Sequence, residues 1–144
     1  MRVRGGGRAG GGYAATLAVG ALVAAGCSGG GDPQATVEQF LHALGDKDTD
    51  RACGLLASAQ PPYRPLDAAE LALCASGLRA AVVDAAGADD LAALRTATVT
   101  GSEVGGDTAV VRATQLQGVP AAYRSDLALV RVDGQWYLRS SPND

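Results

Sequence analysis

The side chains of this sequence that are best able to take part in chemistry are three thiols, at Cys27, Cys53 and Cys74, and one imidazole, at His42. A thiol can accept a lipid, form a disulfide bond, bind a metal ion or attack a substrate, and its compartment decides which role is open to it. The sequence has no C-x-x-C pair, no phosphate-binding glycine loop and no Ser-His-Asp set in a recognisable pattern. We therefore expect neither a metal site nor a cofactor, and the role of the thiols depends on where the chain is sent.

The first 26 residues have the composition of an export signal. Arg2, Arg4 and Arg8 form a basic start, and residues 13–25 are an uncharged run rich in Ala, Val and Leu. A bilayer span needs about 20 residues, so this run is too short for a stable anchor and is typical of a secretory signal peptide. Because no Arg-Arg pair is present, the general secretory route is favoured over twin-arginine export.

The residues that end this run resemble the lipobox of bacterial lipoproteins. Small residues occupy the three positions before Cys27, although the commonest residue of the family at the first of these positions is Leu rather than Ala24. The resemblance implies that signal peptide 1–26 is removed and that Cys27 carries a diacylglycerol, which would hold the protein at the extracytoplasmic face of the cell membrane. The glycine-rich residues 27–32 then form a flexible tether. The alternative is an ordinary signal peptide, cleaved near Ala25, with Cys27 unmodified.

Export also decides the role of the other two cysteines. Cys53 and Cys74 are an even pair in an oxidising compartment, so we expect one disulfide bond between them. The bond would close a loop of about 22 residues, and chain entropy then predicts roughly 3 kcal/mol of stabilisation. A metal or redox site built on these two cysteines is the weaker alternative.

The mature chain is acidic. The full sequence has 12 basic and 15 acidic residues, and three of the basic ones leave with the signal peptide, so the mature net charge is −6. Without a basic cluster, we expect no nucleic-acid partner. Anionic lipid would not attract this domain either, so acylation would have to supply its attachment to the membrane.

Hydrophobic periodicity predicts a single α+β domain over residues 33–142, with its helices first. The first helix starts at the capping residue Asp32, with Pro33 in its first turn, and ends at Gly45. Its apolar residues recur at i, i+3, i+4 and i+7, which is one helical face. Residues 49–58 are expected to form the second helix, before a proline-rich loop.

The third helix is expected to begin at Asp67, which can form a capping box with Glu70. Cys53 and Cys74 both fall on the core-facing side of their helices in this pattern, as a helix-to-helix bridge requires. The apolar seam of the third helix is made of Leu71, Cys74, Leu78 and Val82.

From about Leu94 the apolar period changes from 3.6 to 2, which predicts strands. The strongest turn signal is Asp133-Gly134, which favours a two-residue hairpin. The first turn stays open between Gly105-Gly106 and Gly106-Asp107, and a one-residue slip would reverse the faces of its strands. The four predicted strands are residues 96–104, 108–114, 126–132 and 135–140.

The Asp133-Gly134 turn also predicts the pairing of the last two strands. The expected partners are Val132 and Gln135, Arg131 and Trp136, Val130 and Tyr137, and Leu129 and Leu138. Leu127, Leu129, Trp136 and Leu138 then share one face, which we expect to be the core side. Arg131 would lie beside the indole of Trp136 in a cation–π contact.

Three features together resemble the nuclear-transport-factor-2-like superfamily, which includes ketosteroid isomerase. They are the first helix around residues 37–44, the strand pair joined at Gly106-Asp107, and the hairpin at residues 129–138. The resemblance implies three N-terminal helices packed on the concave face of a curved, four-stranded antiparallel sheet, in a cone that often holds a pocket. The fold supports many unrelated activities, so it does not by itself define a function.

Isomerases of this superfamily use an Asp or His base with Tyr or Asp donors, and this sequence offers such residues by type alone. His42 lies about 150° from the centre of its helix's apolar face, so we expect it at the solvated surface. None of the others has a recognisable partner, and packing or surface roles are favoured, including for the exposed threonines Thr96, Thr98 and Thr100. The candidate bases are Asp84, Glu103 and Asp126, and the candidate donors are Tyr63, Tyr123 and Tyr137.

The sequence therefore predicts a lipid-anchored, extracytoplasmic domain without catalytic activity. Its expected role is to bind a small apolar ligand or a protein partner at the cell envelope. The alternative is a small isomerase- or cyclase-like enzyme that uses the pocket of the cone.

Overall fold

The computed structural model describes residues 31–140, which have a mixed α+β architecture. The predicted signal peptide and Cys27 lie outside the described residues. The helices of the described part are α1 (Pro33–Gly45), α2 (Thr49–Cys53), α3 (Ala68–Leu78) with its π-helical continuation η1 (Arg79–Val83), α4 (Ala88–Thr96), and the 3-10 turns η2 (Ala113–Gln115) and η3 (Ala121–Tyr123). The strands are β1 (Leu56–Ala57), β2 (Thr98–Val99), β3 (Glu103–Gly105), β4 (Thr108–Val111), β5 (Leu116–Gln117), β6 (Leu127–Val132) and β7 (Gln135–Arg139).

The main sheet has five strands in the order β1-β7-β6-β4-β3. Neighbouring strands are antiparallel except β1 and β7, which run parallel. β2 and β5 form a separate antiparallel pair. The α+β class is confirmed, and the main sheet differs from the expected four antiparallel strands by its parallel edge strand.

The second helix is shorter than predicted because its last residues belong to the sheet. α2 ends at Cys53, and Leu56 pairs with Leu138 of β7. Ala57, its neighbour in β1, is fully buried. The backbone pairing and burial gained in the sheet outweigh the helical pattern of residues 49–58, because tertiary contacts readily override local propensity.

The predicted strand over residues 96–104 is confirmed only in part, because two short strands replace one continuous strand. Its first residue, Thr96, ends helix α4, while Thr98–Val99 pairs with β5 and Glu103–Gly105 pairs with β4. α4 was missed because Asp89-Asp90 resembles a polar loop. Acidic residues also favour the first turn of a helix, where they interact with the helix dipole, and that is where the structure places this pair.

The two hairpins have a definite register. Gly105 pairs with Thr108, so the turn of the first hairpin is Gly106-Asp107, which resolves the choice left open by the sequence. In the second hairpin, all four predicted pairs are confirmed. Its turn residues, Asp133 and Gly134, have φ of 50° and 81°, the left-handed conformation that a two-residue hairpin of this kind requires.

α1 packs between the sheet and the other helices, and it carries much of the core. Its start is capped by Asp32, whose side chain accepts a hydrogen bond from the backbone N–H of Gln34. At its other end, Gly45 lies so close to α4 that a Cβ there would be 2.6 Å from the backbone nitrogen of Arg95. The core cluster draws on α1, α4 and the sheet, and includes Val37, Leu41, Leu44, Leu94, Val111, Leu129, Trp136 and Leu138.

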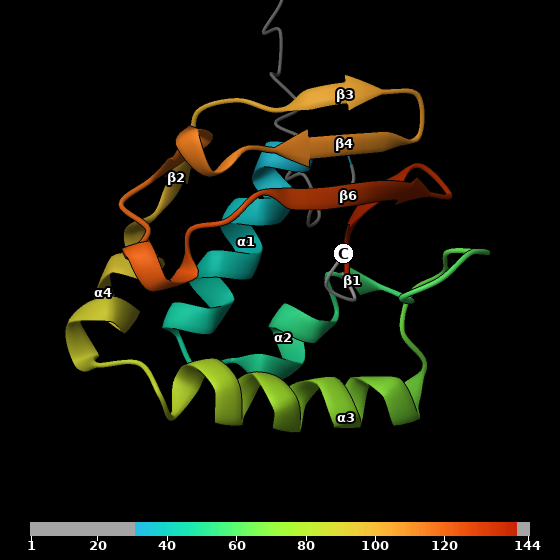
Figure 1. Ribbon diagram of the computed structural model, residues 1–144. Coiled ribbons are helices and arrows are strands. Elements are labelled where there is room, and N and C mark those ends of the chain that lie inside the picture. Colours follow the sequence, from blue (N-terminus) through green and yellow to red (C-terminus); the bar gives the residue numbers. More distant parts are fainter. Residues whose placement is uncertain (1–30, 141–144) are drawn as a thin grey trace, which may run out of the picture.

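Figure 1 shows how these elements are layered. The strands β3, β4 and β6 lie at one end of the domain, and α1 begins beside them and runs toward the opposite end. α3 lies across that opposite end, beyond α2 (Figure 1). None of the residues of α3 is fully buried, but the predicted seam is partly buried, and its residues Leu78 and Val82 pack against the core cluster.

Candidate functional site

The feature that stands out on the surface is an apolar groove of about 470 Å³ beside α3. One wall follows a single stripe of α3 and η1, at positions i, i+3, i+4, i+7, i+8 and i+11, which spans about 17 Å. The other wall comes from β1, the segment that follows it, and the end of β7. The lining residues are Glu70, Leu73, Cys74, Gly77, Leu78 and Ala81 on the first wall, and Leu56, Ala59, Leu66 and Ser140 on the second.

The groove is open, and its leucines reach the solvent. Leu73 is 74% exposed, which is unusual for a large aliphatic side chain in the middle of a helix. Exposed leucines at single positions are common, so what sets this surface apart is that its apolar lining is continuous along the groove. The groove is therefore the candidate functional site.

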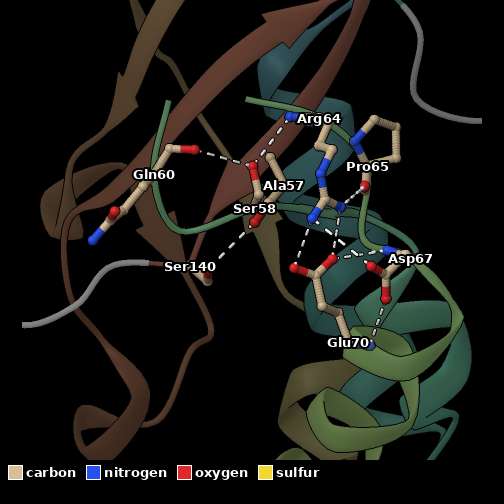
Figure 2. Close-up of polar contacts among 8 residues, drawn as sticks. All are labelled: Ala57, Ser58, Gln60, Arg64, Pro65, Asp67, Glu70 and Ser140. Atoms are coloured by element: carbon tan, nitrogen blue, oxygen red, sulfur yellow. Dashed lines mark hydrogen bonds and ion pairs between the residues drawn. The ribbon is translucent and has the colours of Figure 1, made fainter. Parts of the chain in front are cut away.

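A polar network fixes the start of α3 beside the groove (Figure 2). The Asp67 side chain accepts from the backbone N–H of Glu70, and the Asp67 N–H donates to Glu70 Oε2, which is the predicted capping box. Arg64 donates to both carboxylate oxygens of Glu70, over 2.7 and 2.9 Å. This bidentate pair connects the loop before α3 to the first turn of the helix.

The loop before α3 is joined in turn to the sheet, as Figure 2 shows. Ser58 donates its backbone N–H to the carbonyl of Arg64, and its Oγ accepts the N–H of Arg64. Ser140, just after β7, donates its hydroxyl to the carbonyl of Ala57. The two walls of the groove are thus connected by hydrogen bonds, and α3 is held at a defined distance from the sheet edge.

A second hollow of about 360 Å³ adjoins the groove and shares Ala59 and Glu70 with it. Its other lining residues are Ser58, Gln60, Pro62 and Arg64, so it is more polar than the groove. The polar groups here are already engaged with one another, since Ser58 also donates its hydroxyl to the carbonyl of Gln60. This hollow therefore forms a polar margin to the apolar groove.

The carboxylate at this margin is not suited to act as a general base. The pKa of Glu70 lies below its ordinary value, first because Arg64 donates hydrogen bonds to it and second because the backbone N–H of Asp67 does so. The pKa of Arg64 is raised in turn, first because of its hydrogen bonds to Glu70 and then because of the charge of that carboxylate. A carboxylate that holds its charge this firmly is a poor proton acceptor at neutral pH, so its role is to hold α3.

Acid is expected to weaken the start of α3. Because the pKa of Glu70 is lowered by folding, its contribution to stability is complete above the ordinary glutamate pKa of about 4.3. That contribution is lost as the pH falls through the lowered folded value. The Glu70→Gln variant keeps an acceptor for the Asp67 N–H but loses the ion pair. In thermal unfolding followed by circular dichroism, the melting temperature of this variant should therefore fall less between about pH 7 and pH 3 than that of the wild type.

The matched control for this experiment is Asp84→Asn, which removes another exposed carboxylate just after η1. Among the described residues, Asp84 takes part in no ion pair. This variant should lose as much melting temperature in acid as the wild type. Equal losses for Glu70→Gln and the wild type would contradict the role assigned to the pair with Arg64.

The Cys53–Cys74 disulfide is present and confirms the predicted pairing. It joins the end of α2 to the middle of α3, with 6.0 Å between the two Cα atoms. Cys53 is fully buried, whereas Cys74 is half-buried and lines the groove. Because no residue of α3 is fully buried, this bond and the polar network at its start add to the partly buried contacts that Leu78 and Val82 make with the core.

The structure places His42 differently from the prediction. Its Nε2 lies 2.8 Å from the carbonyl oxygen of Ala97, and the side chain is half-buried rather than solvated. The reason is α4, which the sequence did not reveal and which packs along that side of α1. His42 therefore links α1 to the chain after α4, and the structure gives it a packing role.

Two of the candidate bases share one arginine. Arg112 pairs with Glu103 over 2.9 Å and with Asp126 over 3.1 Å. The pKa of Asp126 lies below its ordinary value, first because the backbone N–H of Ala113 donates to it and second because Arg112 does so. Asp126 is therefore firmly ionised at neutral pH. Asp84, the third candidate, is exposed.

The candidate donors have other partners. Tyr63 lies against the guanidinium of Arg139, with 5.1 Å to the ring centre, and Tyr137 donates its hydroxyl to Gln135. Tyr123 packs against the core cluster. Within residues 31–140, no tyrosine hydroxyl forms a hydrogen bond with His42 or with a candidate base. Arg131 lies 5.3 Å from the centre of the Trp136 ring, which confirms the predicted cation–π contact.

The groove is a feature that sequence reasoning missed. A signal was present, since Leu73 lies off the predicted seam and makes α3 apolar on more than one side. A helix that is apolar all round is ordinarily buried. The predicted seam is partly buried, with Leu78 and Val82 packed against the core, and Leu73, which lies off that seam, is exposed in the groove.

Comparisons with known protein families, curated proteins and solved structures found no match to this chain.

In the part of the chain from residue 31 to residue 140, no single helix is both long and apolar enough to cross a bilayer. Two segments, Ala68–Val83 and Ala88–Thr96, reach that length and composition only when taken together across a bend of 115°. Over the same residues, no three His, Cys, Asp or Glu side chains are grouped as metal ligands.

Proposed function

We propose that this chain is a lipid-anchored, extracytoplasmic binding domain without catalytic activity, and that the groove beside α3 is its binding surface. The observation that carries the proposal is the groove itself, with the exposed Leu73 on a helix that has no buried residue. Apolar surface of this extent is costly to leave in water, and it is typical of ligand and partner sites.

The proposed location is supported by two separate parts of the sequence. Ala24-Ala25-Gly26-Cys27 resembles a lipobox, and the tether after it would let a domain stand off the membrane. The disulfide between Cys53 and Cys74 fits the oxidising compartment to which that signal would send the chain.

The proposed absence of catalysis is supported by how the interior and the ionisable groups are used. The space between α1 and the sheet is occupied by one cluster of buried side chains, which includes Val37, Leu129 and Trp136. Glu103 and Asp126 are held by Arg112 at the surface. An isomerase would instead need a base and a donor that face a common substrate position.

We also propose that the domain is a variant of the cone-shaped, nuclear-transport-factor-2-like fold. The support is the antiparallel succession of β3, β4, β6 and β7, with α1 packed against it. The parallel strand β1 and the separate pair of β2 and β5 are additions to the expected pattern.

Binding at the groove can be tested with a fluorescent fatty acid that brightens in apolar surroundings. The secreted Cys27→Ala chain should bind it, and Leu73→Glu should weaken binding by about tenfold or more, because a charge would stand where the apolar probe would otherwise cover the exposed leucine. The measurement is a fluorescence titration, with circular dichroism to show that each variant is folded.

Val104 supplies a matched control for this titration. It is the other exposed large aliphatic residue of the described chain, at 57% exposure, and it lies on β3, away from the groove. Val104→Glu should bind the probe as the wild type does. Equal weakening by both variants would remove the groove as the binding surface. No binding of the probe by any variant would restrict the proposed function to a protein partner.

A further inference from the structure

We infer that the occupant of the α3 groove is an amphipathic helix of another envelope protein, which approaches from the side of the domain that faces away from the membrane. The inference rests on the proposed function, because it takes both the groove and the anchor at Cys27 as given. It adds the chemical class of the partner and the direction from which the partner comes.

The shape of the groove fits a helix better than a small molecule. Its wall on α3 is straight for about 17 Å, which is about three helical turns. Leu73 stays 74% exposed at its edge. Small-molecule sites enclose most of their ligand's surface, and a lone acyl chain in this groove would keep one side in water. A partner helix brings its own apolar face and can cover the leucines.

Gly77, in the middle of the groove wall, supports close approach by a second backbone. Glycine is less favourable than alanine inside a helix, so its presence there needs a reason. A Cβ at Gly77 would meet no atom of this chain within 4 Å, so the fold itself does not require glycine. The missing side chain leaves room for an outside element that packs directly onto α3.

An anchor at Cys27 would place the start of α1 near the bilayer and α3 farther from it. The chain between Cys27 and Pro33 can span at most about 20 Å, even when fully extended. Figure 1 shows that α1 begins at the end of the domain where the strands lie, whereas α3 lies across the opposite end. The α3 wall of the groove is thus at the end remote from the attachment point, where envelope proteins are nearer neighbours than the acyl chains of the same bilayer.

Charge adds to the description of the partner. Residues 31–140 contain 14 acidic and nine basic side chains, and the Arg64, Asp67 and Glu70 cluster beside the groove carries a net negative charge. A second copy of this chain would bring the same negative charge, which opposes self-association. Basic residues flanking the apolar face of the partner helix complement it.

Photocrosslinking in the native organism tests the inference with the full-length protein. The photoreactive amino acid p-benzoylphenylalanine replaces Leu73 in one strain and Val104 in a control strain, and the adducts are identified by mass spectrometry after irradiation. Position 73 should give an adduct with one other protein at about tenfold the yield of position 104. The crosslinked peptide should have apolar residues at helical spacing and nearby Lys or Arg. Adding Gly77→Leu, whose Cβ would meet no atom of this chain within 4 Å and whose side chain would occupy the groove, should reduce that yield at least about fivefold.

Each other outcome overturns the inference, and the outcomes separate it from the proposed function. A lipid adduct at position 73, or an adduct with a second copy of the chain, would show a groove that binds a different occupant. The groove would then remain a binding surface, as proposed, but its occupant would not be a helix of another protein. Yields at position 73 no higher than at position 104 would overturn both. A protein adduct that Gly77→Leu leaves unchanged would place the partner outside the groove.

Discussion

Removal of the Cys53–Cys74 bond is expected to lower the free energy of unfolding by about 3 kcal/mol, and to loosen α3 before the rest of the domain. The bond spans a sequence separation of 21 residues, and a closed loop of this length restricts the unfolded chain by about that amount. The loss is large against the total stability of a small domain. It should fall first on α3, because that helix buries none of its own residues.

Two measurements check this expectation. Urea unfolding of the Cys53→Ala/Cys74→Ala variant gives the loss in free energy, and amide hydrogen exchange gives its location. Exchange should rise most over residues 68–83, and least over β6 and β7. The reductant dithiothreitol should destabilise the wild type and leave the variant unchanged. If the reduced wild type were as stable as the oxidised protein, the bond would not have the role that we give it.

The second large effect is expected from Cys27→Ala, which should move the protein from the membrane to the soluble fraction. A diacylglyceryl group supplies two acyl chains, and two chains anchor stably where one binds only reversibly. The mature domain is acidic, so charge would not hold it to anionic lipid after the thiol is lost. Cell fractionation and immunoblotting measure the shift.

Ala24→Leu is the matched control for this experiment, because it places the commonest lipobox residue three positions before Cys27. This variant should remain in the membrane fraction and be processed at least as completely as the wild type. If Cys27→Ala stayed in the membrane, the lipobox interpretation would be wrong, and attachment would have to come from a different part of the protein.

The parts of the fold that could be predicted are those fixed by neighbouring residues. The caps of α1 and α3 follow from Asp32 and from the Asp67–Glu70 pair, and both are present. The register of the last hairpin follows from Asp133-Gly134 because a two-residue turn leaves only one pairing. The disulfide could be predicted because the lipobox resemblance sets Cys27 apart, which leaves Cys53 and Cys74 as one pair.

The parts that could not be predicted depend on residues far apart in the chain. β1 forms because Leu56 pairs with Leu138 of β7, and no local sequence pattern predicts a parallel pairing between residues so far apart in the chain. The partial burial of His42 depends on α4, whose acidic first turn resembles a loop. The groove needs α3 and the segment after β1 side by side, so Leu73 and Leu66 become one surface only in the folded chain.

The most direct test of the account is the intact mass of the full-length protein, purified from membranes in mild detergent without reduction. We expect a chain that begins at Cys27 and carries a diacylglyceryl group, with a mass that rises by one pair of hydrogens on reduction because Cys53 and Cys74 are bonded. A chain that begins near Ala25 with Cys27 unmodified, or one whose mass does not change on reduction, would contradict an exported, lipid-anchored binding domain.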